Sequence, residues 1–138
     1  MAADVCPRAI QEQVTLLSQR GVRVELIEGA GQCYVIASAI EAPTPPWDRT
    51  VYDVMIAIPA AYDDAGLDAF YLGLPYVFKG ATHPRVQGAT VEINGRQWQL
   101  VSWHYPEGRP WSRGQDNLET HILHCKGFFF HRGAVNAY

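Results

Sequence analysis

The chain has 138 residues, which suits one domain with a single hydrophobic core. Hydrophobic residues make up 48% of it and charged residues 18%, a composition typical of folded rather than disordered proteins. A net charge of −3 without a Lys/Arg cluster argues against nucleic-acid or anionic-membrane binding. No apolar run approaches the ~18 residues of a membrane span, and the first residues do not resemble a signal peptide.

The cysteines Cys6, Cys33 and Cys125 are widely spaced. Their spacing indicates neither a disulfide framework nor a C-x-x-C metal pair, so we expect free thiols and a cytoplasmic location. His121, His124 and Cys125 have a chelating spacing but no evident fourth ligand. We therefore predict no metal and no other cofactor.

Residues 7–20 are predicted to form a helix, because Ile10, Val14 and Leu17 make one apolar stripe and Gly21 is a good stop. Strands are predicted next, separated by turns and by a loop at 41–49 whose three prolines exclude a sheet ladder. These strands cover residues 22–29, 32–40, 51–59 and 70–74.

The best hairpin signal lies in residues 90–103, where Asn94-Gly95 separates two β-prone runs and favours a type I′ turn. A last helix is predicted from Asp116, a plausible N-cap with Glu119 three residues later. The tail at 132–138 is expected to be loosely ordered. This order, a meander of strands with a helix at each end, predicts an α+β fold in one domain covering 1–138.

Three separated motifs resemble one family. Residues 44–72 resemble its proline-containing loop, strand, P-x-x-Y and short strand. Residues 96–104, RQWQLVSWH, resemble its W-x-x-x-S-x-H motif, and residues 109–122 resemble the W-x-x-G-x-D-x-L start of its last helix. The chain is similar in these motifs to prokaryotic family E of the ubiquitin-conjugating-enzyme superfamily.

The resemblance implies the ubiquitin-conjugating fold: an N-terminal helix, a four-stranded antiparallel meander, a long crossover with a hairpin, and a C-terminal helix. It also implies a bacterial ubiquitin-like modification pathway. The expected partners are a ubiquitin-like protein and a ubiquitin-activating-type adenylating enzyme.

The chain departs from conventional conjugating enzymes at the active site. Those enzymes carry an H-P-N motif shortly before a catalytic cysteine, whereas this chain has His83-Pro84-Arg85 and no cysteine until Cys125. The resemblance therefore implies that thioester chemistry at the usual place is unavailable. Two alternatives remain. One is an unconventional enzyme, and the other is a non-catalytic adaptor that binds a ubiquitin-like protein and its activating enzyme.

Ser102 and His104 are the candidate catalytic residues. They are two apart in a predicted strand, so their side chains leave the same face, and a histidine is the usual base that activates a serine. One interpretation is an oxyester carrier in which Ser102 accepts the acyl group. The other is structural, with Ser102 buried and His104 a hydrogen-bonding partner. A hydrolase of a known motif class is disfavoured because G-x-S-x-G and H-E-x-x-H are both missing.

Three further residues have two interpretations each. His83 could stabilise an oxyanion or shape the loop before Pro84. Trp47, in an expected exposed loop, is a candidate interface residue or a cap on the sheet. Trp111 is a candidate binding residue or an anchor for its loop on the core.

Overall fold

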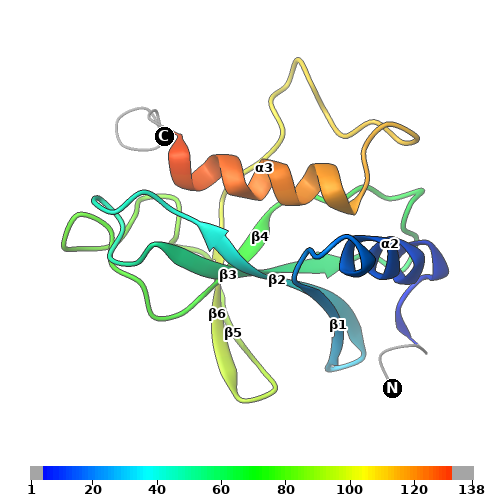
Figure 1. The fold of residues 1–138 in the computed structure, drawn as a ribbon, viewed down its shortest axis with the longest axis horizontal. Coiled ribbons are helices and arrows are strands. Elements are labelled where there is room, and N and C mark those ends of the chain that lie inside the picture. The colour runs from blue at the N-terminus through cyan, green and yellow to red at the C-terminus, as the bar shows by residue number, and fades with distance from the viewer. Residues whose placement is uncertain (1–4, 132–138) are drawn as a thin grey trace.

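The computed structural model describes residues 5–131, and the first element in Figure 1 is helix α2 (Arg8–Gln19). Ile10, Val14 and Leu17 are its buried residues, as their spacing predicted. The helix ends just before Gly21, which adopts a φ of +85° that other residues rarely reach. The sequence-based prediction of this helix is confirmed to within one residue at each end.

The strands form one antiparallel sheet in the order β1-β2-β3-β4-β6-β5. They are β1 (Val24–Gly29), β2 (Gln32–Glu41), β3 (Val51–Ile58), β4 (Phe70–Gly73), β5 (Thr90–Ile93) and β6 (Arg96–Val101). Strands β1 to β4 pair in chain order, and the sheet has six strands and not four. The hairpin β5–β6 is not a separate feature of the crossover, because β6 pairs with β4 and extends the sheet to six strands.

The turn of this hairpin forms at Asn94-Gly95, as predicted. Both residues have positive φ, +52° and +81°, which is the requirement of a type I′ turn. On the other side of β6, Gly73 of β4 lies opposite Trp98. A Cβ at Gly73 would lie 3.2 Å from the Trp98 ring, so a glycine lets the two strands pack at this point.

Helix α3 (Leu118–Phe130) starts one residue later than predicted. The N-cap is Asn117 rather than Asp116, because the Asn117 side chain accepts from the N–H of Thr120 and the Thr120 hydroxyl accepts from the N–H of Asn117. The carboxylate of Asp116 instead accepts a hydrogen bond from the N–H of Ser112, which closes the preceding turn. The tail predicted at 132–138 lies outside the described residues.

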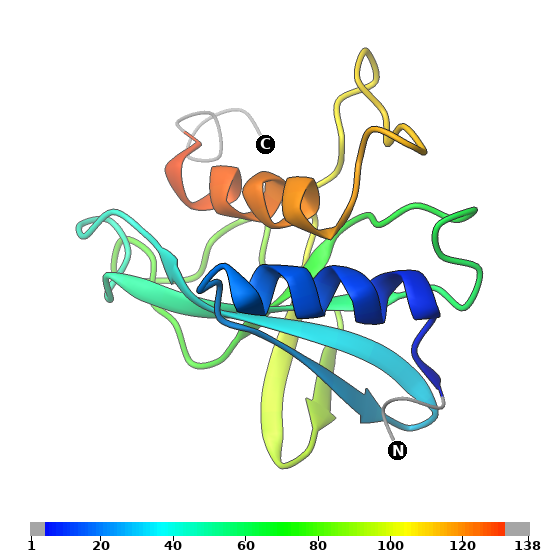
Figure 2. The same ribbon diagram turned by 45° about the vertical axis from the view of Figure 1, so that its right-hand side comes forward.

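Both helices cover the same face of the sheet, and the main core lies between them and the strands (Figure 2). Trp47 belongs to this core: it is only 2% exposed, and its Nε1 donates to the carbonyl of Phe129 at 3.1 Å. The loop around Trp47 is exposed as expected, but the buried ring is not available as an interface residue. The prolines around it shape the loop, while the ring turns inward against α3.

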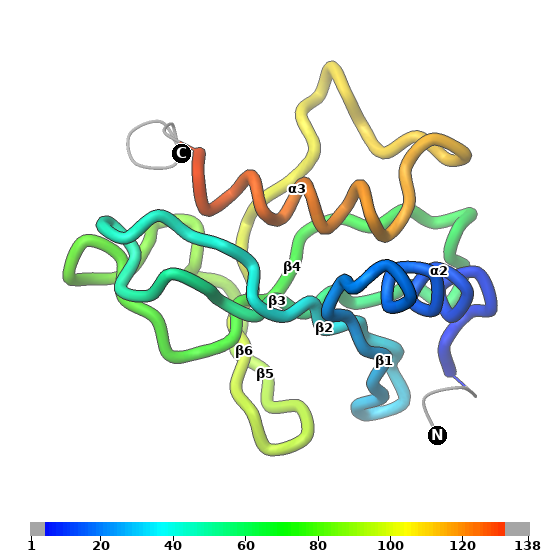
Figure 3. Tube along the Cα trace, in the orientation of Figure 1, coloured from blue at the N-terminus to red at the C-terminus, as the bar shows by residue number. Residues whose placement is uncertain are grey.

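A second, smaller core lies on the other face of the sheet, around Tyr34, Met55, Ile93 and Trp98. It is enclosed because the sheet curls, so that the β1–β2 turn and the β5–β6 hairpin both project away from the helices (Figure 3). Where they meet, a Cβ at Gly29 would lie 2.8 Å from the Ile93 side chain. The curl therefore buries apolar side chains on both faces of the central strands.

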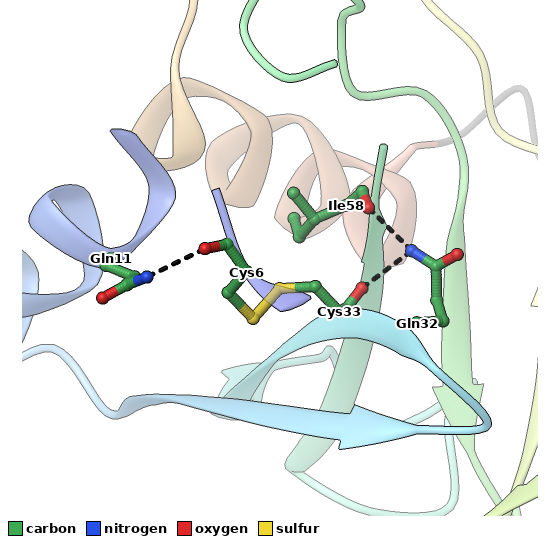
Figure 4. The surroundings of a disulfide bond; sticks show 5 residues. All are labelled: Cys6, Gln11, Gln32, Cys33 and Ile58. Carbon is green, nitrogen blue, oxygen red and sulfur yellow. Dashed lines mark hydrogen bonds between the residues drawn. A yellow bond between two sulfur atoms is a disulfide. The ribbon is translucent and has the colours of Figure 1, made fainter. Parts of the chain in front are cut away.

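Cys6 and Cys33 form a disulfide that joins the segment before α2 to the start of β2 (Figure 4). Gln11 donates to the carbonyl of Cys6 at 2.8 Å, and Gln32 donates to the carbonyl of Cys33 at 3.0 Å. The expectation of free thiols is wrong for this pair, because the fold brings together two cysteines that are 27 residues apart. The argument from cysteine usage for a cytoplasmic location is thereby removed, and the location stays a prediction.

Neither α2 nor α3, the helices of the described residues, is long and apolar enough to cross a membrane.

Two histidines, His83 and His121, are fully buried in the core. His83 stacks on Trp47 with ring centroids 5.6 Å apart, and its Nδ1 accepts from the N–H of Arg85 at 2.9 Å. His121 lies between Tyr105 and the carbonyl of Ala69. Burial lowers the pKa of each imidazole from its ordinary value to about 4, so both rings are neutral in the folded protein at pH 7.

These histidines predict that the free energy of unfolding decreases as the pH is lowered. An unfolded histidine takes up a proton below about pH 6.5, whereas the folded His83 and His121 resist protonation until about pH 4. The stability that they contribute is present above pH 6.5 and is lost as the pH falls towards 4. Each should remove about 2 kcal/mol from the free energy of unfolding at about pH 5.

Urea denaturation between about pH 7 and pH 5 measures this loss. A His121→Gln variant keeps a donor and an acceptor but does not titrate, so its stability should depend less on pH. Equal slopes for wild type and His121→Gln would contradict the assignment.

The disulfide predicts a thiol count. Denatured protein treated with maleimide should gain one label without reductant, on Cys125, and three labels after reduction. Closing a loop of this length stabilises the protein by about 3–4 kcal/mol in the chain-entropy description, so the Cys6→Ser/Cys33→Ser variant should unfold at lower urea. Three labels without reductant would show that the pair is not bonded.

Candidate active site

The pairing of β4 with β6 brings two distant segments together. The register ends at Phe70 opposite Val101, so the residues just before β4 lie beside the residues just after β6. Strand β6 stops at Val101, two residues earlier than predicted, and Ser102 and His104 lie in the connection that follows, where the N–H of Trp103 donates to the carbonyl of Val101 at 3.0 Å. The segment that faces them carries Asp68.

Ser102, His104 and Asp68 form a hydrogen-bonding chain. The Oγ of Ser102 lies 3.5 Å from Nε2 of His104, and Nδ1 of His104 lies 3.0 Å and 3.1 Å from the two carboxylate oxygens of Asp68. The first distance is long for a hydrogen bond, as catalytic contacts often are before a substrate binds. The order serine, histidine, carboxylate is that of an activated nucleophile.

The carboxylate determines which ring nitrogen of His104 carries the proton. A carboxylate only accepts, so Nδ1 must donate to Asp68. In the neutral ring Nε2 is then an acceptor, and it is the atom that faces the Ser102 hydroxyl. This tautomer is the one that allows His104 to remove the proton of Ser102.

The side chains that alternate with Ser102 and His104 anchor the chain to α3. Nε1 of Trp103 donates to the carbonyl of His124 at 2.8 Å. The ring of Tyr105 stacks on the His124 imidazole, with centroids 4.0 Å apart and planes 10° from parallel. These contacts hold the residues on either side of His104 against α3.

His121 connects the two sides of the site. Its Nδ1 is 2.7 Å from the hydroxyl of Tyr105, and its Nε2 is 3.3 Å from the carbonyl of Ala69. Since that carbonyl can only accept, Nε2 donates and Nδ1 accepts from Tyr105. One buried imidazole thus holds the neighbour of Asp68 and the neighbour of His104 together.

The His83-Pro84-Arg85 segment lies against Ser102. The N–H of Ser102 donates to the carbonyl of Arg85 at 2.8 Å, and Nη1 of Arg85 is 3.5 Å from the Ser102 Oγ. His83 is fully buried in the core beside Trp47, so its ring takes part in packing and holds the N–H of Arg85. The residue of this motif that reaches Ser102 is therefore Arg85 and not His83.

An open hollow of about 480 Å³ lies beside His104, and Trp111 forms part of its wall. The Trp111 ring covers Gly66, where a Cβ would lie 2.4 Å from it, and it packs edge-on against Tyr62. The contacts of Trp111 thus anchor its loop on the core and leave part of the ring at the hollow.

The loop of Trp111 is also tied to the loop after β3 by charge. Arg113 forms ion pairs with Asp63 and Asp64 of that loop. These exposed ion pairs add little stability, but they limit how far the two loops can separate.

None of the three cysteines offers an exposed thiol. Cys6 and Cys33 are bonded to each other, and Cys125 is fully buried, which raises the pKa of its thiol far above the ordinary value. Within residues 5–131, His121, His124 and Cys125 do not join a cluster that could hold a metal ion. Ser102 is therefore the nucleophile that the geometry favours.

Sequence reasoning did not identify Asp68 or assign a role to Arg85. Asp68 lies in a loop 36 residues before His104, and no local pattern distinguishes it from Asp63 or Asp64. The signal that could have found it is strand pairing: if 70–74 is placed antiparallel to the end of 90–103, residue 68 falls next to Ser102 and His104.

Comparison with characterised proteins and with solved structures finds no match. Comparison with protein families finds one, described as prokaryotic E2 family E, over residues 10–129. The match covers most of α2, all six strands and nearly all of α3, including both segments of the site. The two helices on one side of an antiparallel sheet, an α+β arrangement, are consistent with an E2-like fold. The chain is a member of prokaryotic E2 family E.

Proposed function

We propose that this E2-like protein carries the C-terminus of a bacterial ubiquitin-like protein as an ester on Ser102. The observation that supports this most directly is the Ser102 Oγ facing Nε2 of His104 at 3.5 Å, while Nδ1 of the same ring is held by Asp68. A serine needs a base in this position to become a nucleophile. The partners would be the ubiquitin-like protein and its adenylating, activating enzyme.

The transfer needs no group beyond these residues and the acyl donor. The Ser102 Oγ attacks the thioester carbonyl on the activating enzyme, and its proton passes to Nε2 of His104. The tetrahedral intermediate collapses, the carbon–sulfur bond breaks, and the departing sulfur takes the proton from His104. The products are the Ser102 ester and a free thiol on the activating enzyme. The exchange is favourable because a thioester releases more free energy on hydrolysis than an oxygen ester does.

The exposure of the site suits a protein-sized donor. The side chains of His104 and Asp68 are 56% and 66% exposed, and the half-buried Ser102 lies beside them, so the site is not at the bottom of a closed pocket. A second protein can therefore present its acyl group at Ser102 without a large opening movement.

A non-catalytic adaptor is the second candidate. It is favoured by the lack of an exposed thiol, since the disulfide and the buried Cys125 leave no place for a thioester. Such an adaptor would bind the ubiquitin-like protein and the activating enzyme without forming a covalent bond.

An adduct assay separates the two candidates. With a ubiquitin-like protein, its activating enzyme and ATP, wild type should form a covalent adduct that survives neutral hydroxylamine, which cleaves thioesters faster than esters. Ser102→Ala should form none, and Ser102→Cys should form one that hydroxylamine cleaves. Ser112→Ala, a half-buried serine in the same connection, is the matched control and should react like wild type.

Binding of the ubiquitin-like protein without any adduct would instead support the adaptor. An undiminished adduct with Ser102→Ala would exclude Ser102 as the acceptor.

The rate of adduct formation should grade the other two residues. His104→Ala removes the base and should slow the reaction roughly 100-fold or more. Asp68→Asn leaves His104 in place but no longer fixes its tautomer, so we expect a smaller decrease in the rate. Single-turnover kinetics measure both. Since both side chains are exposed, thermal unfolding should change little, and a loss of rate that merely tracks a loss of folding would count against catalytic roles.

A further inference from the structure

Arg85 lies next to the Ser102 hydroxyl together with His104. Nη1 of Arg85 and Nε2 of His104 are each 3.5 Å from the Ser102 Oγ. The serine therefore has a base and a cation within reach of one oxygen atom. The base accounts for removal of the proton, but it does not account for the negative charge that an attacked carbonyl oxygen acquires.

The Arg85 side chain is supported at its base. The backbone of Arg85 is bonded on both sides, its N–H to Nδ1 of the buried His83 and its carbonyl to the N–H of Ser102. The side chain is half-buried, and its Nε is shielded from solvent. A guanidinium that is partly shielded from water interacts more strongly with a negative charge than one that is fully hydrated.

We propose that Arg85 is the oxyanion-stabilising residue of the Ser102 site. When the Ser102 Oγ bonds to a carbonyl carbon, the carbonyl oxygen becomes negatively charged. This oxygen is attached to the same carbon as the Oγ. A donor 3.5 Å from the Oγ can reach that oxygen with a small adjustment of its side chain. Ser102, His104, Asp68 and Arg85 then form a complete serine acyl-transfer centre.

This inference deepens the proposed function, since both use Ser102 as the nucleophile, but it requires no partner protein. A complete centre should also react with small activated acyl compounds. With p-nitrophenyl acetate, the Oγ–acetyl bond forms, the bond to p-nitrophenolate breaks, and the Ser102 proton goes to His104. His104 then releases this proton to the solvent, accepts one from the water that attacks the acetyl ester, and passes it to the Ser102 Oγ as the ester bond breaks, which restores the serine and releases acetic acid.

The test measures the rate of p-nitrophenolate release and the labelling of Ser102 by a fluorophosphonate, whose phosphonyl ester mimics the tetrahedral intermediate. Wild type should react in both assays, and Ser102→Ala in neither. Arg85→Ala should slow the reaction roughly 100-fold to 1000-fold, which is the usual effect of losing one oxyanion donor. Arg85→Lys should retain part of the rate, and millimolar guanidinium should partly restore Arg85→Ala.

Arg109→Ala, at an exposed arginine of the neighbouring loop, is the matched control for charge and should react like wild type. Arg85→Gln provides a second neutral variant if Arg85→Ala does not fold, and thermal unfolding identifies the folded variants. Wild-type rates in folded Arg85→Ala or Arg85→Gln would overturn the inference, as would a wild type in which neither reagent modifies Ser102.

The outcome is separable from that of the proposed function. Reaction with the small reagents that depends on Arg85, combined with no adduct of a ubiquitin-like protein, would support this inference and count against the carrier role.

Discussion

Four residue pairs, from Phe70–Val101 to Gly73–Trp98, join β4 to β6, and this pairing brings the residues of the candidate site together. Because the strands are antiparallel, the chain entering β4 and the chain leaving β6 meet at the same edge. The entering chain brings Asp68, and the leaving chain brings Ser102 and His104. The register of this pairing therefore sets which residues of the two segments lie side by side.

The aromatic residues around this edge give it a fixed geometry. Trp103 and Tyr105 alternate in sequence with the two polar residues and are bonded to α3, so this segment cannot rotate without breaking those contacts. His121 bonds both to Tyr105 and to the carbonyl of Ala69. A buried, hydrogen-bonded imidazole therefore lies beneath the exposed site. Because leaving its nitrogen atoms without hydrogen bonds would be costly, it holds Tyr105 and Ala69 in place.

Much of the fold follows from local sequence patterns. The stripe of Ile10, Val14 and Leu17 identified the first helix, and Asn94-Gly95 identified the hairpin, because both signals act over a few residues. The motifs around Trp98 and Trp111 identified the family. Ser102 and His104 were recognisable as candidates since they lie two residues apart in one extended segment.

Features that depend on long-range contacts were not predictable in this way. The pairing of Cys6 with Cys33 and the approach of Asp68 to His104 join residues 27 and 36 positions apart, so spacing alone carried no signal. Trp47 follows prolines that usually lie at the surface, yet the ring turns into the core because α3 offers it an apolar wall and a carbonyl. These contacts exist only once the sheet and α3 have packed.

The central claim is that strand pairing sets His104 as a base towards Ser102, and the most direct measurement is the tautomer of the His104 ring. Long-range proton–nitrogen NMR of the neutral imidazole distinguishes a protonated from an unprotonated ring nitrogen. We expect a protonated Nδ1 and an unprotonated Nε2, with this preference lost in Asp68→Asn. A proton on Nε2 in the wild-type protein would contradict the account, because that nitrogen could not then accept the proton of Ser102.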